Sequence, residues 1–388
     1  LVSKVANDAD VNALRPSFYD VNVKLNHIFS DADRLFASFY VGKDSYRYKF
    51  QDRNNQSTLV WSDDGFTWEE NSNNYYSDKY YIRTKAYMKA RWGNMQGALR
   101  WNHVYSPRLF ANTTVAYNKF HFYDKQSRRE DTWVEGDFKG REEYESQYES
   151  GITDLTFIHD LDYRPLPDHH VRMGAQYVLH RFLPEVTEGS TSTMVDGDDV
   201  DSSSQFNTNG EKTTGHDMSL YAEDDMSITD LFQMIVGARA SLFAVKNKVY
   251  PAFEPRVAAS YQLAPEWRIK ASYAIMHQYV HLLSTMPISL PTDLWVPVSK
   301  NIKPMSSNQI SMGAYSDAVP TFKLSVELYY KWLNNILDFK DGAFFGGGST
   351  GWQRLVESGI GRSRGIELSA KRTEGSITGQ VSYTLSKT

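Results

Sequence analysis

The sequence has no cysteine, which excludes disulfides, cysteine-based zinc or iron–sulfur sites and a thiol nucleophile. It also has no uncharged apolar run of about 18 residues, which excludes a transmembrane helix. Positive charge is not in excess either, since 42 lysines and arginines face 47 aspartates and glutamates, a formal net charge of −5. This balance argues against a basic nucleic-acid-binding protein.

Aromatic residues, in contrast, make up 14% of the 388 residues. The mean hydropathy of −0.53 is nevertheless too polar for a bundle of membrane helices. A transmembrane β-barrel reconciles the two values, because its strands alternate lipid-facing apolar residues with polar residues inside, and aromatic residues ring both interfaces. Composition therefore favours a barrel, with a soluble sandwich or propeller as the alternative.

Hydrophobic residues recur with a period of two. Between Thr321 and Leu333, apolar or aromatic residues occupy the even positions from Phe322 to Trp332, and most odd positions are polar. We expect Leu324, Val326 and Leu328 to face lipid, and Lys323, Ser325 and Glu327 to face the lumen. The same alternation recurs at 171–180, 232–239, 267–275, 366–371 and 377–385.

Short and long connections alternate along the chain. Short breaks rich in turn residues lie at 30–34, 106–108, 164–169, 229–230, 264–266, 317–320 and 373–375. Longer connections lie near 46–80, 124–149, 184–216, 244–252, 281–306 and 337–362. Outer-membrane barrels have tight periplasmic turns and long outer loops. The pattern predicts an all-β fold, a transmembrane antiparallel up-and-down β-barrel of about fourteen strands, with residues 1–388 as a single domain.

Several segments resemble, in chain order, parts of the barrel of TonB-dependent outer-membrane receptors. They are Asp33–Gly42 (an early upward strand), Tyr221–Asp230 with Val236–Arg239 (a mid-barrel hairpin), Glu254–Gln262 with Trp267–Tyr273 (the next hairpin), Leu290–Pro297 through Asn301–Pro304 (the Bacteroidetes branch), and Ser363–Leu368 with Val381–Ser386 (a hairpin near the barrel's end). Together these motifs span nearly the whole chain.

The resemblance implies a role in the bacterial outer membrane. Barrels of this family have about twenty-two strands around a plug domain, so the chain is expected to be an interior portion of the barrel without the plug and the terminal strands. The implied function is active import of a scarce large nutrient such as an iron chelate, corrinoid, glycan or peptide. The implied partners are outer-membrane lipid, a TonB-type energy transducer acting through the absent plug, and a surface lipoprotein; nucleic acid is not among them. A passive porin-like channel, or an adhesin or enzyme barrel, is the alternative.

Aromatic residues in the long connections are the candidate ligand contacts. A planar ring stacks on a sugar, corrin or chelate and offers contact area with little loss of entropy. The competing interpretation is an interfacial girdle or packing between loops. The candidates are Trp61, Trp68, Trp133, Trp295, Phe344, Phe345 and Trp352.

Groups for metal or catalytic chemistry are sparse. Asp196, Asp198, Asp199 and Asp201 are the candidate calcium ligands, and a solvated acidic loop is the alternative. The pair His169–His170 does not by itself supply convergent haem or metal ligands. No G-x-S-x-G nucleophile motif occurs in the sequence. We therefore expect a protein that is not an enzyme and has no cofactor apart from a candidate structural calcium.

Overall fold

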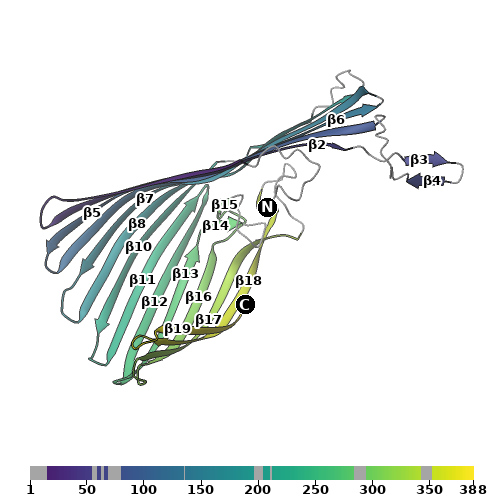
Figure 1. Ribbon diagram of the computed structural model, residues 1–388. Coiled ribbons are helices and arrows are strands. Elements are labelled where there is room, and N and C mark those ends of the chain that lie inside the picture. Colours follow the sequence, from purple (N-terminus) through teal and green to yellow (C-terminus); the bar gives the residue numbers. More distant parts are fainter. Residues whose placement is uncertain are drawn as a thin grey trace.

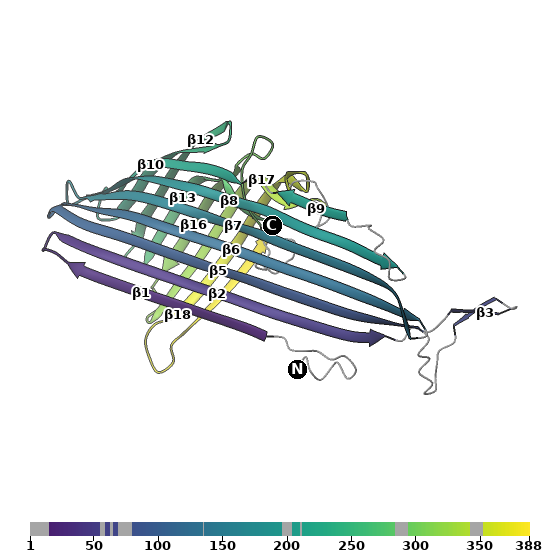
Figure 2. The same cartoon turned by 90° about the horizontal axis from the view of Figure 1, so that it is seen from above.

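A computed structural model defines the fold. It describes residues 15–54, 59–62, 65–68, 80–134, 136–195, 204–209, 212–283, 294–341 and 352–388. One large antiparallel sheet dominates and curves into a trough (Figures 1 and 2). No helix in these ranges is long and apolar enough to cross a membrane.

Fourteen strands follow one another through the sheet in chain order, each antiparallel to the next. They are β1 (Arg15–Ile28), β2 (Asp33–Asn54), β5 (Tyr80–Ser106), β6 (Leu109–Val134), β7 (Asp137–Tyr163), β8 (His169–Val195), β10 (Thr213–Ser227), β11 (Phe232–Val245), β12 (Lys248–Ala264), β13 (Trp267–Gln278), β16 (Met305–Ser316), β17 (Phe322–Phe339), β18 (Val356–Arg372) and β19 (Gly379–Lys387). This arrangement confirms the predicted up-and-down topology.

Among the described residues, six shorter elements lie outside this path. The strand β9 (Ser204–Asn209) pairs with the end of β8. Two separate hairpins form between β3 (Leu59–Ser62) and β4 (Gly65–Trp68), and between β14 (Val280–Leu283) and β15 (Leu294–Pro297). A short 3₁₀ turn, η2, covers Trp352–Arg354.

All seven predicted short turns join consecutive strands. In the first, the Ser30 hydroxyl accepts a hydrogen bond from the Asp33 backbone N–H at 3.0 Å. In the turn before β11, the Thr229 hydroxyl accepts one from the Phe232 N–H, also at 3.0 Å. Serine and threonine hydroxyls stabilise tight turns in this way, so the composition of these breaks predicted their position correctly.

Two of the predicted long connections are wrong. Near 124–149 the strands continue, β6 to Val134 and β7 from Asp137, and near 244–252 β11 and β12 are separated only by Lys246 and Asn247. Lys246 has a φ of 49°, the left-handed conformation that such a tight turn uses. The polar composition suggested loops, but a hairpin beyond the membrane has no need of an apolar face.

Cross-strand ion pairs stabilise the extended β6–β7 hairpin. Lys125 Nζ lies 2.6 Å from Glu145 Oε1, and Arg141 Nε lies 2.8 Å from Asp131 Oδ1. Strands β5, β7 and β8 each reach 27 residues. Because a tilted strand crosses a bilayer in about 9–11 residues, more than half of each strand lies outside the membrane, as the projecting ends of β2 and β6 in Figure 1 illustrate.

The predicted alternation of faces is confirmed on β17. Leu324, Val326 and Leu328 are 36%, 45% and 47% exposed on the outer face. On the opposite face, Glu327 is half-buried and accepts a hydrogen bond from Tyr315 of β16.

The sheet has two free edges. In the described part of the chain, β1 pairs only with β2, and β19 pairs only with β18. The two terminal strands are therefore not joined to each other.

Candidate ligand-binding face

The concave face of the sheet carries a row of polar side chains at matched register positions. The row follows successive register partners across five strands: Asp160 of β7, Gly174 of β8, Tyr221 of β10, Arg239 of β11 and Glu254 of β12. Side chains at paired positions share one face of a sheet. The inner wall is thus lined by groups that bind polar ligands, the reverse of the lipid-facing side.

Hydrogen bonds cross-link this inner row. Tyr221 donates its hydroxyl hydrogen to Asp160, and Arg239 Nη2 donates to Gln176 Oε1 at 3.0 Å. The neighbouring His180 Nδ1 lies 2.7 Å from Asp154 Oδ1. These contacts hold the side chains in fixed positions, which limits the entropy that ligand binding removes.

Glu254 carries a buried carboxyl group at the end of this row. Its side chain accepts hydrogen bonds from the backbone N–H and from Nδ1 of His277, at 2.9 and 3.2 Å. Only 6% of Glu254 is exposed. Because a buried carboxylate must be paired or hydrogen-bonded, this contact fixes the end of β13 against β12.

Beyond β13 the chain folds into the trough instead of away from it. We call residues 279–283 and 294–304 the inward segments. Tyr279 stacks on Phe243 of β11 with 5.1 Å between ring centroids and 5° between planes, and its hydroxyl lies 2.8 Å from Ser241 Oγ. Tyr250 of β12 donates to the Ser299 carbonyl at 2.6 Å. One end of the inward segments is therefore attached to the wall formed by β11 and β12.

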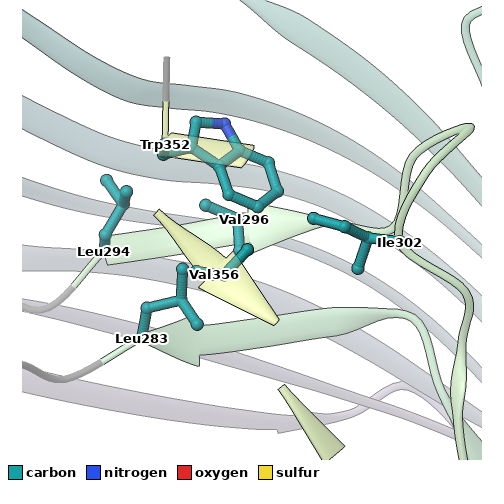
Figure 3. Close-up of a cluster of buried hydrophobic side chains, with 6 residues drawn as sticks. All are labelled: Leu283, Leu294, Val296, Ile302, Trp352 and Val356. Carbon is teal, nitrogen blue, oxygen red and sulfur yellow. The ribbon is translucent and has the colours of Figure 1, made fainter. Parts of the chain in front are cut away.

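A hydrophobic cluster holds the other end (Figure 3). Leu283, Leu294, Val296 and Ile302 of the inward segments pack with Trp352 and Val356, with Leu337 and Phe339 alongside. The hairpin β14–β15 touches β17 on one side and β7 and β8 on the other. It therefore spans the trough from wall to wall.

His281 lies within this hairpin and is 4% exposed. Its Nε2 has no hydrogen-bond partner among the described residues. Burial alone lowers the pKa of His281 to about 4, because the charged imidazolium is poorly solvated there. The side chain is neutral at pH 7.

A second polar region lies at the short-turn end of the inner wall. Here Arg268 and Lys270 of β13 meet Lys323 of β17 and Lys371 of β18 around a cavity of about 380 Å³. The side-chain ammonium of Lys270 lies 4.6 Å from the ring centroid of Tyr315. This grouping places positive charge at the rim opposite the inward segments.

The aromatic candidates are dispersed rather than gathered. Trp352 is 8% exposed within the hydrophobic cluster, so the alternative of packing between loops describes its position. Trp295 is half-buried on β15, opposite Leu282. Trp133 lies on β6 and not in a loop, with its ring centroid 5.4 Å from that of Phe138.

The remaining candidates are placed by backbone only or lie outside the described residues. In the β3–β4 hairpin, Trp61 pairs in register with Phe66 and Trp68 with Leu59. Residues outside the described ranges are Phe344, Phe345, Asp196, Asp198, Asp199 and Asp201. Calcium binding by these four aspartates stays a prediction.

The two adjacent histidines serve separate strands. His169 Nδ1 lies 2.7 Å from Asp224 of β10, and His170 Nε2 lies 2.7 Å from Asp162 of β7. Within the described ranges, no group of three or more histidines and carboxylates is placed to hold a metal ion.

Sequence reasoning missed the acidic partners of the inner row. It identified the alternating segment 232–239 that ends at Arg239, but it did not single out Asp160 or Glu254, because the relevant signal lies in the register between strands. Matching the parities of β7, β10 and β12 around their turns would have placed both carboxylates on the same face of the sheet as Arg239.

Comparison with known proteins places the chain in a structural context. A family model described as "TonB dependent receptor-like, beta-barrel" matches residues 29–388. No curated protein matches the chain.

Several solved structures align with the chain at low sequence identity. The RagAB peptide importer aligns at 10% identity with a TM-score of 0.54, over 96% of this chain and 46% of that one. The ferripyoverdine receptor of the outer membrane of Pseudomonas aeruginosa aligns at 10% identity and 0.50, over 98% and 55%. The ferric-catecholate receptor Fiu of E. coli K12 aligns at 11% and 0.48, over 98% and 64%. The chain spans less than two thirds of each of these proteins.

Proposed function

Because the chain belongs to the TonB-dependent receptor β-barrel family and so lies in the outer membrane, we propose that it forms much of the barrel wall of an active importer. The cargo is a scarce, large, polar nutrient such as an iron chelate, corrinoid, glycan or peptide. Family members are transporters and not enzymes, and we propose no chemical step on the cargo.

The observation that carries this proposal is the pair of inward segments. They attach to β11 and β12 through Tyr279 and Tyr250, and reach β7, β8 and β17 through the hairpin β14–β15. Such a crossing obstructs the trough. Obstruction supports a gated importer over the passive porin-like channel, since passive diffusion needs a continuous water-filled path.

The inner polar row supports a hydrophilic cargo. Asp160, Arg239 and Glu254 face the lumen with side chains already fixed by hydrogen bonds. Of the aromatic candidates, Trp295 has the most favourable position, because it is half-buried on the hairpin that spans the trough. We propose that Trp295 contacts cargo on its way past β14–β15, with Trp61, Trp68, Phe344 and Phe345 contributing from the long connections.

The partners follow from the free edges and from the family. Unpaired backbone groups of β1 and β19 are not stable in lipid, so we propose that further strands pair with both edges and close the barrel. A closed barrel of about twenty-two strands needs a plug. We propose that a TonB-type transducer acts on that plug, and that a surface lipoprotein covers the long-loop rim.

Uptake measurements on the full-length protein test this function. Cells expressing it are given labelled candidate nutrients, with and without a protonophore, and in a strain that lacks the transducer. We expect surface binding in every case and uptake only in energised cells with the transducer. Uptake that persists after both treatments would favour the passive channel.

A further inference from the structure

A row of cations lies on the outer face of β2 and β5. Lys43 and Arg47 belong to β2, and Lys89 and Arg91 belong to β5. Arg47 of β2 is the register partner of Lys89 of β5. We call these four residues the outer basic patch. Lys43 and Arg47 are exposed, and Lys89 and Arg91 are half-buried.

The outer basic patch continues the lipid-facing surface. Along each strand, the patch residues alternate in step with apolar residues and therefore point to the same face as they do. These apolar residues are Phe39 and Val41 on β2, and Met95 and Leu99 on β5. Counted from the short turns, Val41 is the ninth residue of β2. Met95 is the eleventh residue of β5 when the count runs back from Tyr105. A strand needs about 9–11 residues to cross a bilayer. The patch therefore begins at the level where the membrane ends, on the long-loop side.

Among the described residues, no ion pair neutralises the charge of the patch. Ion pairs on this face join β6 to β7, as in Lys125–Glu145, and in the described part of the chain none includes a member of the patch. The guanidinium of Arg91 lies 4.5 Å from the ring centroid of Tyr123. The positive charge of Arg91 contributes most to lowering the pKa of Lys89. Desolvation and other nearby cations lower it further. Crowding of like charges on a strand pair is unfavourable unless an anion compensates it.

A groove extends the patch away from the membrane. It has a volume of about 930 Å³, and Arg47 of the patch lines it with Arg15, Lys49 and Lys85. Hydroxyl groups of tyrosine and serine line its other parts, together with Glu143 and Glu145. Cations beside hydroxyls suit a headgroup that carries both phosphate and sugar.

We propose that the outer basic patch binds the phosphate-bearing headgroups of anionic lipids in the outer leaflet of the membrane. Lipid is the ligand favoured by position, because the four cations lie on the outward face at the level where headgroups end the bilayer. An acidic protein partner would also complement the charge, but it would have to displace lipid from the edge of the apolar surface. The inference rests on the membrane location and goes beyond transport.

Lipid binding by the full-length protein tests the proposal. The patch variant K43Q/R47Q/K89Q/R91Q is compared with the charge-conserving K43R/R47K/K89R/R91K. The matched control R268Q/K270Q/K323Q/K371Q removes four charges from the lumen face at the opposite rim. Each protein, in non-ionic detergent, is titrated with lipid A, with phosphatidylglycerol, with phosphatidylcholine and with inorganic phosphate, and bound lipid is counted by native mass spectrometry.

We expect both anionic lipids to bind the wild type and the charge-conserving variant, and phosphatidylcholine to bind neither specifically. Each charge removed from the patch should weaken anionic lipid binding about fivefold at low salt, and the control should bind like the wild type. The assignment would be overturned if the patch variant bound anionic lipid as well as the wild type, or if the control lost as much lipid binding as the patch variant. Occupancy of the patch by inorganic phosphate at the same concentrations would also overturn it. An acidic protein that co-purifies only with proteins whose patch is intact, while lipid binding is unchanged, would overturn it as well. Lipid counting requires neither an energy transducer nor a nutrient, so its outcome is separate from that of the uptake assay.

Discussion

Tyr221 on β10 donates a hydrogen bond to Asp160 on β7 across the intervening strand β8, directly over Gly174. A Cβ atom at position 174 would lie 2.8 Å from the Tyr221 hydroxyl oxygen and 2.9 Å from Asp160 Oδ1. Three neighbouring strands are thus linked by a contact that needs a residue without a side chain in the middle.

The substitution Gly174→Ala should disrupt this link. The added methyl group also approaches the His159 carbonyl oxygen, at 2.7 Å, so backbone as well as side chains must move. We expect a loss of about 1–3 kcal/mol in unfolding free energy from overpacking and the broken hydrogen bond. Thermal unfolding in detergent measures it. Gly97→Ala is the control, since a Cβ there meets nothing within 4 Å; equal stability of the two variants would contradict the role of Gly174.

A charge on the lipid face of β17 should destabilise the protein far more than a charge inside. Val326→Arg places a guanidinium in the hydrocarbon and should cost about 2–4 kcal/mol near the midplane. Ser325→Arg is the matched control, because its side chain points into the trough. The folding free energies of the two variants are compared by equilibrium folding into lipid vesicles. The folded fraction is read from the gel shift of the folded band. A larger loss for Ser325→Arg would reverse the assignment of faces.

Acid should loosen the inward segments through His281. The ordinary histidine pKa of 6.5 applies when the hairpin is open, and the pKa is about 4 when it is closed. The open state therefore binds the proton more tightly, and the closed state loses stability as pH falls from about 6.5 to 4, by roughly 3 kcal/mol at most. Above this range His281 has no effect on opening.

Hydrogen exchange of residues 279–283 and 294–304 measures this opening across the pH range. We expect His281→Phe to abolish the acid-dependent part, because a neutral ring of similar size replaces the imidazole. His27→Gln alters an exposed histidine on β1 and should leave it intact. An unchanged acid response in His281→Phe would show that another group is responsible.

The β6–β7 hairpin should be accessible at the cell surface. An epitope inserted after Gly136, at its tip, is expected to bind antibody on intact cells. The same epitope inserted after Pro265, in the turn between β12 and β13, should bind antibody only after permeabilisation. Surface labelling at Pro265 and not at Gly136 would invert the orientation.

Sequence reasoning was most successful where one strand carries its own signal. The alternation through Leu324, Val326 and Leu328 identified β17, and the hydroxyl of Ser30 identified the first turn. It failed where the determinant is a neighbouring strand: Lys125 and Glu145 are twenty positions apart, and only their pairing shows that the chain between them is a hairpin. Trp352 illustrates the same limit, because its burial depends on Leu283 and Val296 of another connection.

The attachment of the inward segments at both ends has a kinetic consequence. A cargo too wide for the remaining passage must separate Tyr279 from Phe243 or withdraw Leu294 and Val296 from their cluster. Either event exposes apolar surface worth about 1.5–3 kcal/mol for each side chain. Entry would then be limited by local unfolding and would carry its steep temperature dependence. Uptake should slow on cooling far more sharply than diffusion through water.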